Sequence, residues 1–310
     1  MSTELKFSRR AALAGAAAFP LAAATAGAAR AQAPLTGPKM SPFQRLKVGN
    51  FDVTTLLAGT VTRDNPHSIF GLNVDKETFD NVATAARLPT DVAQFFFTPT
   101  VVNSGSELVL FDTGLNAEGT SAALAAAGYT TDQIDVVVIT HMHGDHIGGL
   151  TKEDGSATFA NARYVTGRAE YDAWAAQDND RFKTKVAPFA EKMTFLEDGG
   201  SVASGLTAMA AFGHTPGHMN YMIEDGGTQL YLGADFANHY VLSLAQPDWE
   251  VKFDMDKPAA AATRKRILDM LATDKIAFTG YHMPWPGVGY VDRKDGAYAY
   301  VAHSYQLMLG

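Results

Sequence analysis

Cysteine is absent from the 310 residues of this chain. The absence excludes disulfide bonds, thiolate metal ligands and a cysteine nucleophile. A metal site could therefore use only histidine and carboxylate ligands, a donor set that suits zinc, manganese, iron or cobalt.

Basic residues are also scarce. Lys and Arg number 25 against 33 Asp and Glu, which gives a formal net charge of −8, and no long basic run occurs. Nucleic acid is not an expected partner, because its recognition relies on clustered cations that neutralise phosphates. With 46% hydrophobic and 19% charged residues, the composition is that of a globular protein with a sizeable core. A small molecule is the expected partner.

The N-terminal segment lacks the long, strongly apolar run of a membrane anchor. Instead, "SRRAALAGAAAFPLAAATAGAARAQA" has a basic start, a weakly apolar alanine-rich stretch and small residues at its end. This pattern predicts an export signal peptide over residues 1–33 and a single domain over residues 34–310. Ser8 before Arg9 and Arg10 resembles the twin-arginine class. We therefore expect a periplasmic protein without a stable membrane anchor.

Two small-residue motifs compete as the cleavage point of this signal. Ala29–Ala31 and Ala31–Ala33 both fit the A-x-A pattern. Pro34 follows the second motif and would hinder a peptidase. The sequence therefore favours cleavage after Ala31 and a mature start at Gln32.

The rest of the chain alternates strand and helix patterns. "TPTVVNSGSELVLFDTG" predicts a hairpin with an Asn-Ser-Gly turn, and "DVVVIT" predicts a strand buried on both faces. Helices are predicted near residues 167–177, 180–192 and 258–272. A long loop over residues 64–90 is expected to hold a short helix near residues 75–87. This order indicates an α/β layered protein.

The segment "ITHMHGDHIGGL" directly follows the buried strand. It carries three of the nine histidines of the chain, together with an aspartate. Its glycines let the backbone fold closely around an ion, and histidines two positions apart can point the same way on extended backbone. The segment therefore predicts metal binding, with further ligands supplied from elsewhere. Its candidate ligands are His141, His143, Asp145 and His146.

Three downstream segments supply further candidates, each after a predicted strand. They are "GHTPGH", with His214 and His218, "YLGAD", with Asp235, and "GYHMP", with His282. Side chains that follow strands can project from the same edge of a sheet. Spacing alone does not choose between His214 and His218. The remaining histidines are expected to be ordinary core or surface residues.

The order H-x-H-x-D-H, T-P-G-H, G-A-D and a late lone histidine resembles the metallo-β-lactamase superfamily, over roughly residues 45–305. The resemblance implies an α/β fold of the four-layer αβ/βα sandwich type and two divalent metal ions. It also implies that Asp235 bridges the two ions. The implied ligands of the first ion are His141, His143 and His218. The implied ligands of the second ion are Asp145, His146 and His282.

Two further residues receive roles from the same resemblance. Asp112, in "LVLFDTG", is expected to orient ligand histidines, as carboxylates beside metal sites commonly do. His214 is expected to be a supporting or structural residue beside the metal ligands. A homodimer is also a family expectation.

The reaction implied by the resemblance is hydrolysis. Two ions, zinc first and manganese, cobalt or cadmium as alternatives, share a hydroxide that attacks a carbonyl or phosphoryl centre. Asp145 lies beside this nucleophile and is the expected catalytic residue, because it can accept or relay a proton. A metal-binding protein without turnover is the alternative from another class. The bridging carboxylate disfavours that alternative.

Within the superfamily, "YHMPWPGVGYV" and the block around "AAGY" are most similar to methyl parathion hydrolases and their lactonase-like relatives. This similarity implies hydrolysis of small hydrophobic esters. Phosphotriesters are the first expectation, and acyl-homoserine lactones or other lactones and carboxylesters are the alternative. Trp174 and Phe182 would line the leaving-group pocket. The loop "LNAEGT" lacks the aromatic residue of organophosphate-cleaving members, and Phe96 is a candidate to replace it. Segments 64–97 and 167–192 would cover the site.

Overall fold

The computed structural model describes residues 37–309. Contacts divide the chain into Met1–Lys39 and Met40–Gly310, and the second unit carries the fold. The predicted signal peptide and its two cleavage motifs lie outside the described residues. None of the described helices is both long and apolar enough to cross a membrane.

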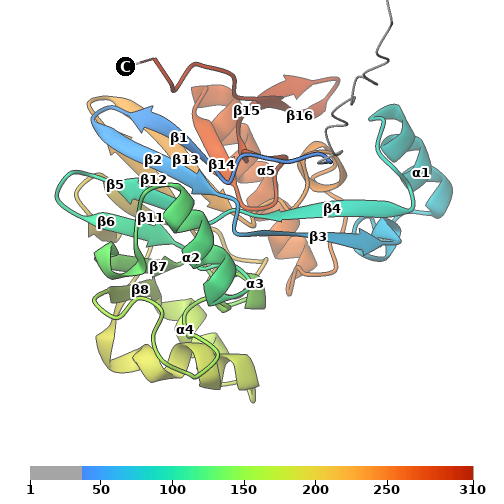
Figure 1. Cartoon of the computed structure of the whole chain (residues 1–310). Coiled ribbons are helices and arrows are strands. Elements are labelled where there is room, and N and C mark those ends of the chain that lie inside the picture. Colours follow the sequence, from blue (N-terminus) through green and yellow to red (C-terminus); the bar gives the residue numbers. More distant parts are fainter. Residues whose placement is uncertain (1–36, 310) are drawn as a thin grey trace, which may run out of the picture. The chain divides into compact units, whose positions relative to one another are not determined.

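Two seven-stranded sheets dominate the second unit (Figure 1). In order across the first sheet, the strands are β1 (Phe43–Val48), β2 (Phe51–Leu56), β5 (Thr100–Asn103), β6 (Leu108–Phe111), β7 (Val136–Ile139), β8 (Arg163–Gly167) and β9 (Met193–Leu196). Across the second sheet they are β10 (Ser201–Ala203), β11 (Leu206–Ala210), β12 (Met219–Asp225), β13 (Thr228–Ala234), β14 (Ala277–Gly280), β15 (Val288–Lys294) and β16 (Ala297–Ala302). Strands β6 to β9 run parallel to one another, as do β13 and β14.

Alternation along β7 shows how the layers are built. All four of its residues are buried. Val136 and Val138 join a core shared with the second sheet, where they meet side chains such as Tyr221. Val137 and Ile139 join the core on the opposite face of the first sheet. The continuous apolar run therefore reflects a strand covered on both faces, as predicted.

Helices cover the two outer faces. The α-helices are α1 (Lys76–Ala85), α2 (Ala117–Ala126), α3 (Gly144–Ile147), α4 (Arg168–Ala175) and α5 (Lys257–Asp274). Leu124 of α2 and Trp174 of α4 pack on the first sheet. Ile267 and Leu271 of α5 pack on the second sheet beside Phe278 of β14. This αβ/βα layering is the predicted four-layer sandwich.

A separate antiparallel ribbon is formed by β3 (Gly59–Asp64) and β4 (Val92–Phe97). It extends from the two sheets toward α1 (Figure 1). Phe95 and Phe97 share one face of β4 and are buried in a cluster with Phe79 of α1. The predicted loop over residues 64–90 therefore contains the predicted helix and is anchored by aromatic packing.

The helix predicted over residues 180–192 is not regular. The segment forms a π-helical turn, η3 (Phe182–Val186), and a 3-10 turn, η4 (Ala187–Lys192). Pro188 lies within the second turn. Proline has no amide hydrogen and clashes with the preceding turn, so a regular helix cannot continue through it. Other short turns are η1 (Pro66–Ser68), η2 (Thr131–Gln133) and η5 (Tyr240–Ala245).

The loops with candidate ligands follow strands of both sheets. In the first sheet, β6 is followed by Asp112 and β7 by His141. In the second sheet, β11, β13 and β14 are followed by His214, Asp235 and His282. Segments far apart in the sequence thus deliver their polar side chains to one place.

Candidate metal centre

Three histidines converge at the end of β7. One ring nitrogen from each of His141, His143 and His214 lies within 4.8 Å of the others. His143 Nδ1 is 3.1 Å from His141 Nε2 and 3.0 Å from His214 Nε2. Burial lowers the pKa of His141 well below its usual value and that of His143 to about 3. Neutral imidazole is the form that binds a metal ion.

A second group lies beside the first. Asp145, His146 and His282 also bring ligand atoms within 4.8 Å of one another. Asp145 Oδ2 is 3.3 Å from His282 Nε2 and 3.7 Å from His146 Nε2. Burial opposes protonation of His282, yet Asp235 and Asp145 raise its pKa to about 10. This half of the centre is therefore rich in negative charge.

Asp235 lies between the two groups. Its Oδ1 is 3.4 Å from His146 Nε2, and its Oδ2 is 3.4 Å from His214 Nε2 and 3.2 Å from His282 Nε2. The carboxylate therefore contacts histidines of both groups. This is the position that a bridging ligand would occupy.

The donors fit divalent ions. His146 Nε2 and Asp235 Oδ1 are buried and have no hydrogen-bond partner within residues 37–309, although buried polar atoms are rarely left unpaired. Both atoms face the cluster. Seven imidazole and carboxylate side chains form three overlapping groups, and they match the ligands that divalent transition metals prefer. The centre is therefore a site for divalent metal ions.

The geometry corrects the sequence-based assignment of two histidines. His218, expected as a ligand, joins none of the groups of converging side chains. Its Nε2 instead accepts a hydrogen bond from the backbone N–H of Asp235, at 3.2 Å. His214, expected as a supporting residue, takes the place beside His143. The short turn between His214 and His218 lets the His214 ring enter the centre. His218 immediately precedes β12 and contacts the backbone of Asp235.

Hydrogen bonds from outside the cluster orient its histidines. Asp112 Oδ2 lies 2.8 Å from His146 Nδ1 and accepts a 2.8 Å hydrogen bond from the hydroxyl of Thr140. His282 Nδ1 lies 2.8 Å from the carbonyl oxygen of Phe96. Such contacts fix the ring orientation of a metal ligand. Phe96 thus serves the centre through its backbone.

Asp254 and Arg264 were not identified from the sequence. Asp254 Oδ1 lies 2.8 Å from His214 Nδ1, and its Oδ2 accepts a 2.7 Å hydrogen bond from the buried guanidinium of Arg264. Arg264 also donates to the carbonyl oxygen of Phe236, next to the bridging Asp235. The surrounding "KFDMDK" and "ATRKRI" contain no histidine or glycine turn that would have indicated this role.

A cavity of about 330 Å³ opens beside the metal centre. Its apolar wall includes Phe95, Phe97, Leu115 and Phe253. Its polar wall includes His143, Asp145, Asp235 and His282, together with the guanidinium groups of Arg63 and Arg181. Asp145 is the more accessible of the two carboxylates, with 22% of its side chain exposed against 4% for Asp235.

Three predicted pocket residues lie elsewhere. Trp174 is buried behind His143 and donates its ring N–H to Glu170. Phe182 is buried against Tyr171. Phe96 points away from the cavity because alternate residues of a strand face opposite sides, which leaves Phe95 and Phe97 on the cavity face. Segment 167–192 therefore contributes Arg181, rather than an aromatic ring, to this wall.

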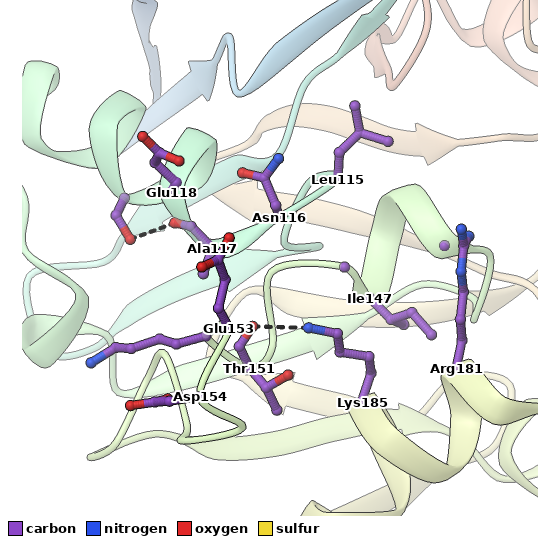
Figure 2. Close-up of a pocket in the computed structure, with 14 residues that line it drawn as sticks. Leu115, Asn116, Ala117, Glu118, Ile147, Thr151, Glu153, Asp154, Arg181 and Lys185 are labelled. Carbon is purple, nitrogen blue, oxygen red and sulfur yellow. Dashed lines mark hydrogen bonds between the residues drawn. The ribbon is translucent and has the colours of Figure 1, made fainter.

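A larger cavity, of about 720 Å³, adjoins the first and shares Leu115, Gly144 and Arg181 with it. Figure 2 shows Arg181 at one end of the group of residues that line this second cavity, and Lys185 beside Thr151. A side chain at position 144 would collide with the Arg181 guanidinium. Glycine between two ligand residues therefore leaves room for an arginine at the boundary of the two cavities.

A two-sheet sandwich with paired His and Asp groups at its edge is the architecture of a metal-binding α/β protein. The family model of the metallo-beta-lactamase superfamily matches residues 98–280, and the chain belongs to this superfamily.

Similar proteins include lactonases. An N-acyl homoserine lactonase from Bacillus sp is 27% identical over 163 residues, or 51% of this chain, and one from Bacillus cereus is 27% identical over 160 residues. The chain spans about 60% of the length of these curated relatives. The solved structure of AidC, a dizinc quorum-quenching lactonase with bound product, has a TM-score of 0.79 at 24% identity and covers 86% of this chain and 99% of AidC. The hydrolase AbOPH has a TM-score of 0.78 at 23% identity and covers 87% of this chain and all of AbOPH. These structural likenesses concern the fold.

Proposed function

We propose that the protein hydrolyses lactones of the N-acyl homoserine class with two zinc ions. The observation that carries the proposal is a bridged His and Asp centre that opens into a small, phenylalanine-lined cavity. The lactonase names among its relatives favour this substrate over the phosphotriester that the sequence suggested first. The dizinc lactonase of similar fold supports zinc as the metal.

The side chains of the centre have different roles in binding the ions and in moving a proton. His141, His143 and His214 would hold one ion, and Asp235 would contact both ions. The remaining ligands, Asp145, His146 and His282, would hold the other ion. When bound, such a pair of ions supplies Lewis-acid activation of a carbonyl oxygen and of water. Asp145 faces the cavity and would accept the proton released as water attacks, which makes it the catalytic carboxylate.

The cavity suits a small ester with an apolar substituent. Its volume is at the lower end of the range usual for small-molecule sites. The rings of Phe95 and Phe97 flank His282, with centroid separations of 5.4 and 5.5 Å, so an acyl chain can pack beside the metal centre. Arg63 and Arg181 offer N–H donors to a carbonyl or amide oxygen on the opposite side.

Aryl phosphotriesters are the second candidate. The loop after Asp112 contributes Leu115, and no aromatic ring, to the cavity. Phe95 and Phe97 supply rings from β4 instead, and these can contact an aryl leaving group. The same centre could then act on a phosphoryl oxygen in place of a carbonyl oxygen.

Parallel assays test the two candidates. Zinc-loaded protein is offered N-hexanoyl homoserine lactone, with ring opening followed by chromatography, and a nitrophenyl dialkyl phosphate, with release of the coloured phenol. Metal content is measured on the same samples. The proposal predicts about two zinc ions per chain and a higher kcat/KM for the lactone. Turnover of the phosphotriester alone would favour the second candidate, and turnover of neither by zinc-loaded protein would contradict both.

A further inference from the structure

Glu170, in the first turn of α4, is a fully buried carboxylate. Its Oε1 accepts hydrogen bonds from the backbone N–H of Met142, at 2.9 Å, and from the ring N–H of Trp174, at 2.6 Å. Its Oε2 accepts from the hydroxyl of Thr215, at 2.7 Å, and from the backbone N–H of Gly217, at 2.9 Å. Both oxygens are therefore fully engaged.

Three of the four donors belong to the two loops that carry the first group of histidines, and the fourth, Trp174, lies in α4 itself. Met142 lies between His141 and His143 in the loop after β7 of the first sheet. Thr215 follows His214 in the loop between β11 and β12 of the second sheet. One carboxylate thus joins the two loops on which this group depends.

The carboxylate has no cationic partner among the described residues. Burying a charge without a counterion is costly unless hydrogen bonds replace its hydration. Four donors do so for Glu170. A hydrophobic side chain at this buried position would avoid that cost, so packing alone does not account for a glutamate here.

Gly217 shows that the contact depends on close approach. A Cβ atom at this position would collide with the backbone of Glu170. Because glycine has no side chain, the second loop can lie directly on the first turn of α4. The sequence of the loop and the position of the carboxylate are therefore matched.

We infer that Glu170 is a positioning residue that sets the spacing of His141, His143 and His214 for one metal ion. It touches neither the cavity nor the proposed substrate, and it acts through the backbones of the two loops. The inference depends on the metal centre but not on which ester is hydrolysed. It predicts that a change at Glu170 weakens one of the two metal sites and leaves Asp145, His146 and His282 able to bind the other ion.

The substitution Glu170→Gln tests this with little change in shape. An amide has one acceptor oxygen, so its NH₂ group must replace one carboxylate oxygen. If the NH₂ group faces Met142 and Trp174, it meets two N–H donors and can accept a hydrogen bond from neither. Facing the second loop, it could donate to the hydroxyl of Thr215 but would leave the N–H of Gly217 unpaired. In either orientation the variant therefore loses at least one link to one of the two loops, through Met142 or through Gly217.

Metal binding is the readout. Zn²⁺ affinities are measured by competition with a chromophoric chelator, and Co²⁺-substituted protein is examined by its d–d absorption. Wild-type protein is expected to bind two ions. In Glu170→Gln, the affinity for one ion should fall by about 10- to 100-fold, the range found for changes beside metal ligands. The cobalt spectrum of that site should change while that of the other site persists.

Three further variants separate positioning from general loss of stability. Trp174→Phe and Thr215→Val each remove one donor to Glu170 and should give a smaller loss at the same site. They also provide the test if Glu170→Gln does not fold. Tyr164→Phe removes a buried 3.0 Å hydrogen bond to the carbonyl oxygen of Phe159 in the neighbouring core, so it should lower thermal stability without changing metal affinity.

Two results would overturn the inference while the proposed hydrolase stands. One is two ions bound by Glu170→Gln with wild-type affinities and spectrum. The other is metal loss that follows thermal stability equally in Glu170→Gln and Tyr164→Phe. Wild-type protein that binds no ion would instead overturn the metal centre itself.

Discussion

The two halves of the metal centre differ in charge and in what supports them. The first half consists of three imidazoles, whose loops are held by Glu170 and one of whose rings, that of His214, is held by Asp254. The second half adds the partly exposed carboxylate of Asp145 and is held by Asp112 and the carbonyl oxygen of Phe96. Both halves reach the cavity, but only the second presents a partly exposed carboxylate to it.

This difference indicates that the fold separates two tasks, holding a metal ion and transferring a proton. A well-supported group of three imidazoles can hold an ion in a fixed place. A group with an accessible carboxylate can also handle a proton at the substrate. Asp235 belongs to both halves, so its loss should affect both tasks. The predictions below test this division, from the largest expected effect to the smallest.

Asp235→Asn should have the largest effect, because it removes the negative charge that the two halves share. We expect loss of both ions and a fall in kcat/KM of at least about 10⁴-fold, since metal activation supplies several kcal/mol of transition-state stabilisation. Elemental analysis after dialysis and the lactone assay measure the two effects. Full retention of two ions would show that Asp235 does not join the halves.

Replacing the two histidines of "GHTPGH" by alanine compares a ligand with its support. His214→Ala should lose the ion of the first half and lower kcat/KM by about 10³-fold, because one Lewis acid is removed. His218→Ala should keep two ions at reduced affinity and lower kcat/KM by about 10- to 100-fold, because it loosens the backbone of Asp235. The reverse ranking in metal content and rate would restore His218 as the ligand.

Asp145→Asn tests the second half of the metal centre alone. The amide keeps the size of the side chain but cannot accept a proton, so hydrolysis should fall by about 100-fold or more while at least one ion stays bound. Single-turnover rates and metal content are measured together. Undiminished hydrolysis would contradict the catalytic role of Asp145.

Much of the fold could be predicted from local patterns. The buried run of β7 and the segment "MHGDH" specified a strand followed by a polar turn, because burial and glycine content leave a direct trace in the sequence. The choice between His214 and His218 could not be made in this way. It depends on how the three residues between His214 and His218 direct the two side chains, and both histidines occupy plausible positions in the motif.

The supporting carboxylates were harder to find. Glu170 and Asp254 act through contacts between segments that are distant in sequence, and neither has a neighbouring residue that signals this. The aromatic wall shows the same limit. "FFF" indicated a ring in the cavity, but only the register of β4 decided that Phe95 and Phe97 face it and Phe96 does not.

Arg181→Gln is expected to have the smallest effect. It tests whether the substrate extends from the metal centre to the boundary of the two cavities. Within the described residues, the guanidinium has no hydrogen-bonded or ion-paired partner, so its loss should leave folding and metal content unchanged. If substrate reaches the boundary of the two cavities, KM should rise by roughly tenfold, the value of one hydrogen bond to a charged donor, with little change in kcat. Lys185→Gln is the matched control, because Lys185 lines only the larger cavity and donates to the carbonyl oxygen of Thr151. An equal rise in KM for both variants would mean that general positive charge, rather than contact with Arg181, attracts the substrate. An unchanged KM in Arg181→Gln would place the substrate entirely among the phenylalanines of the smaller cavity.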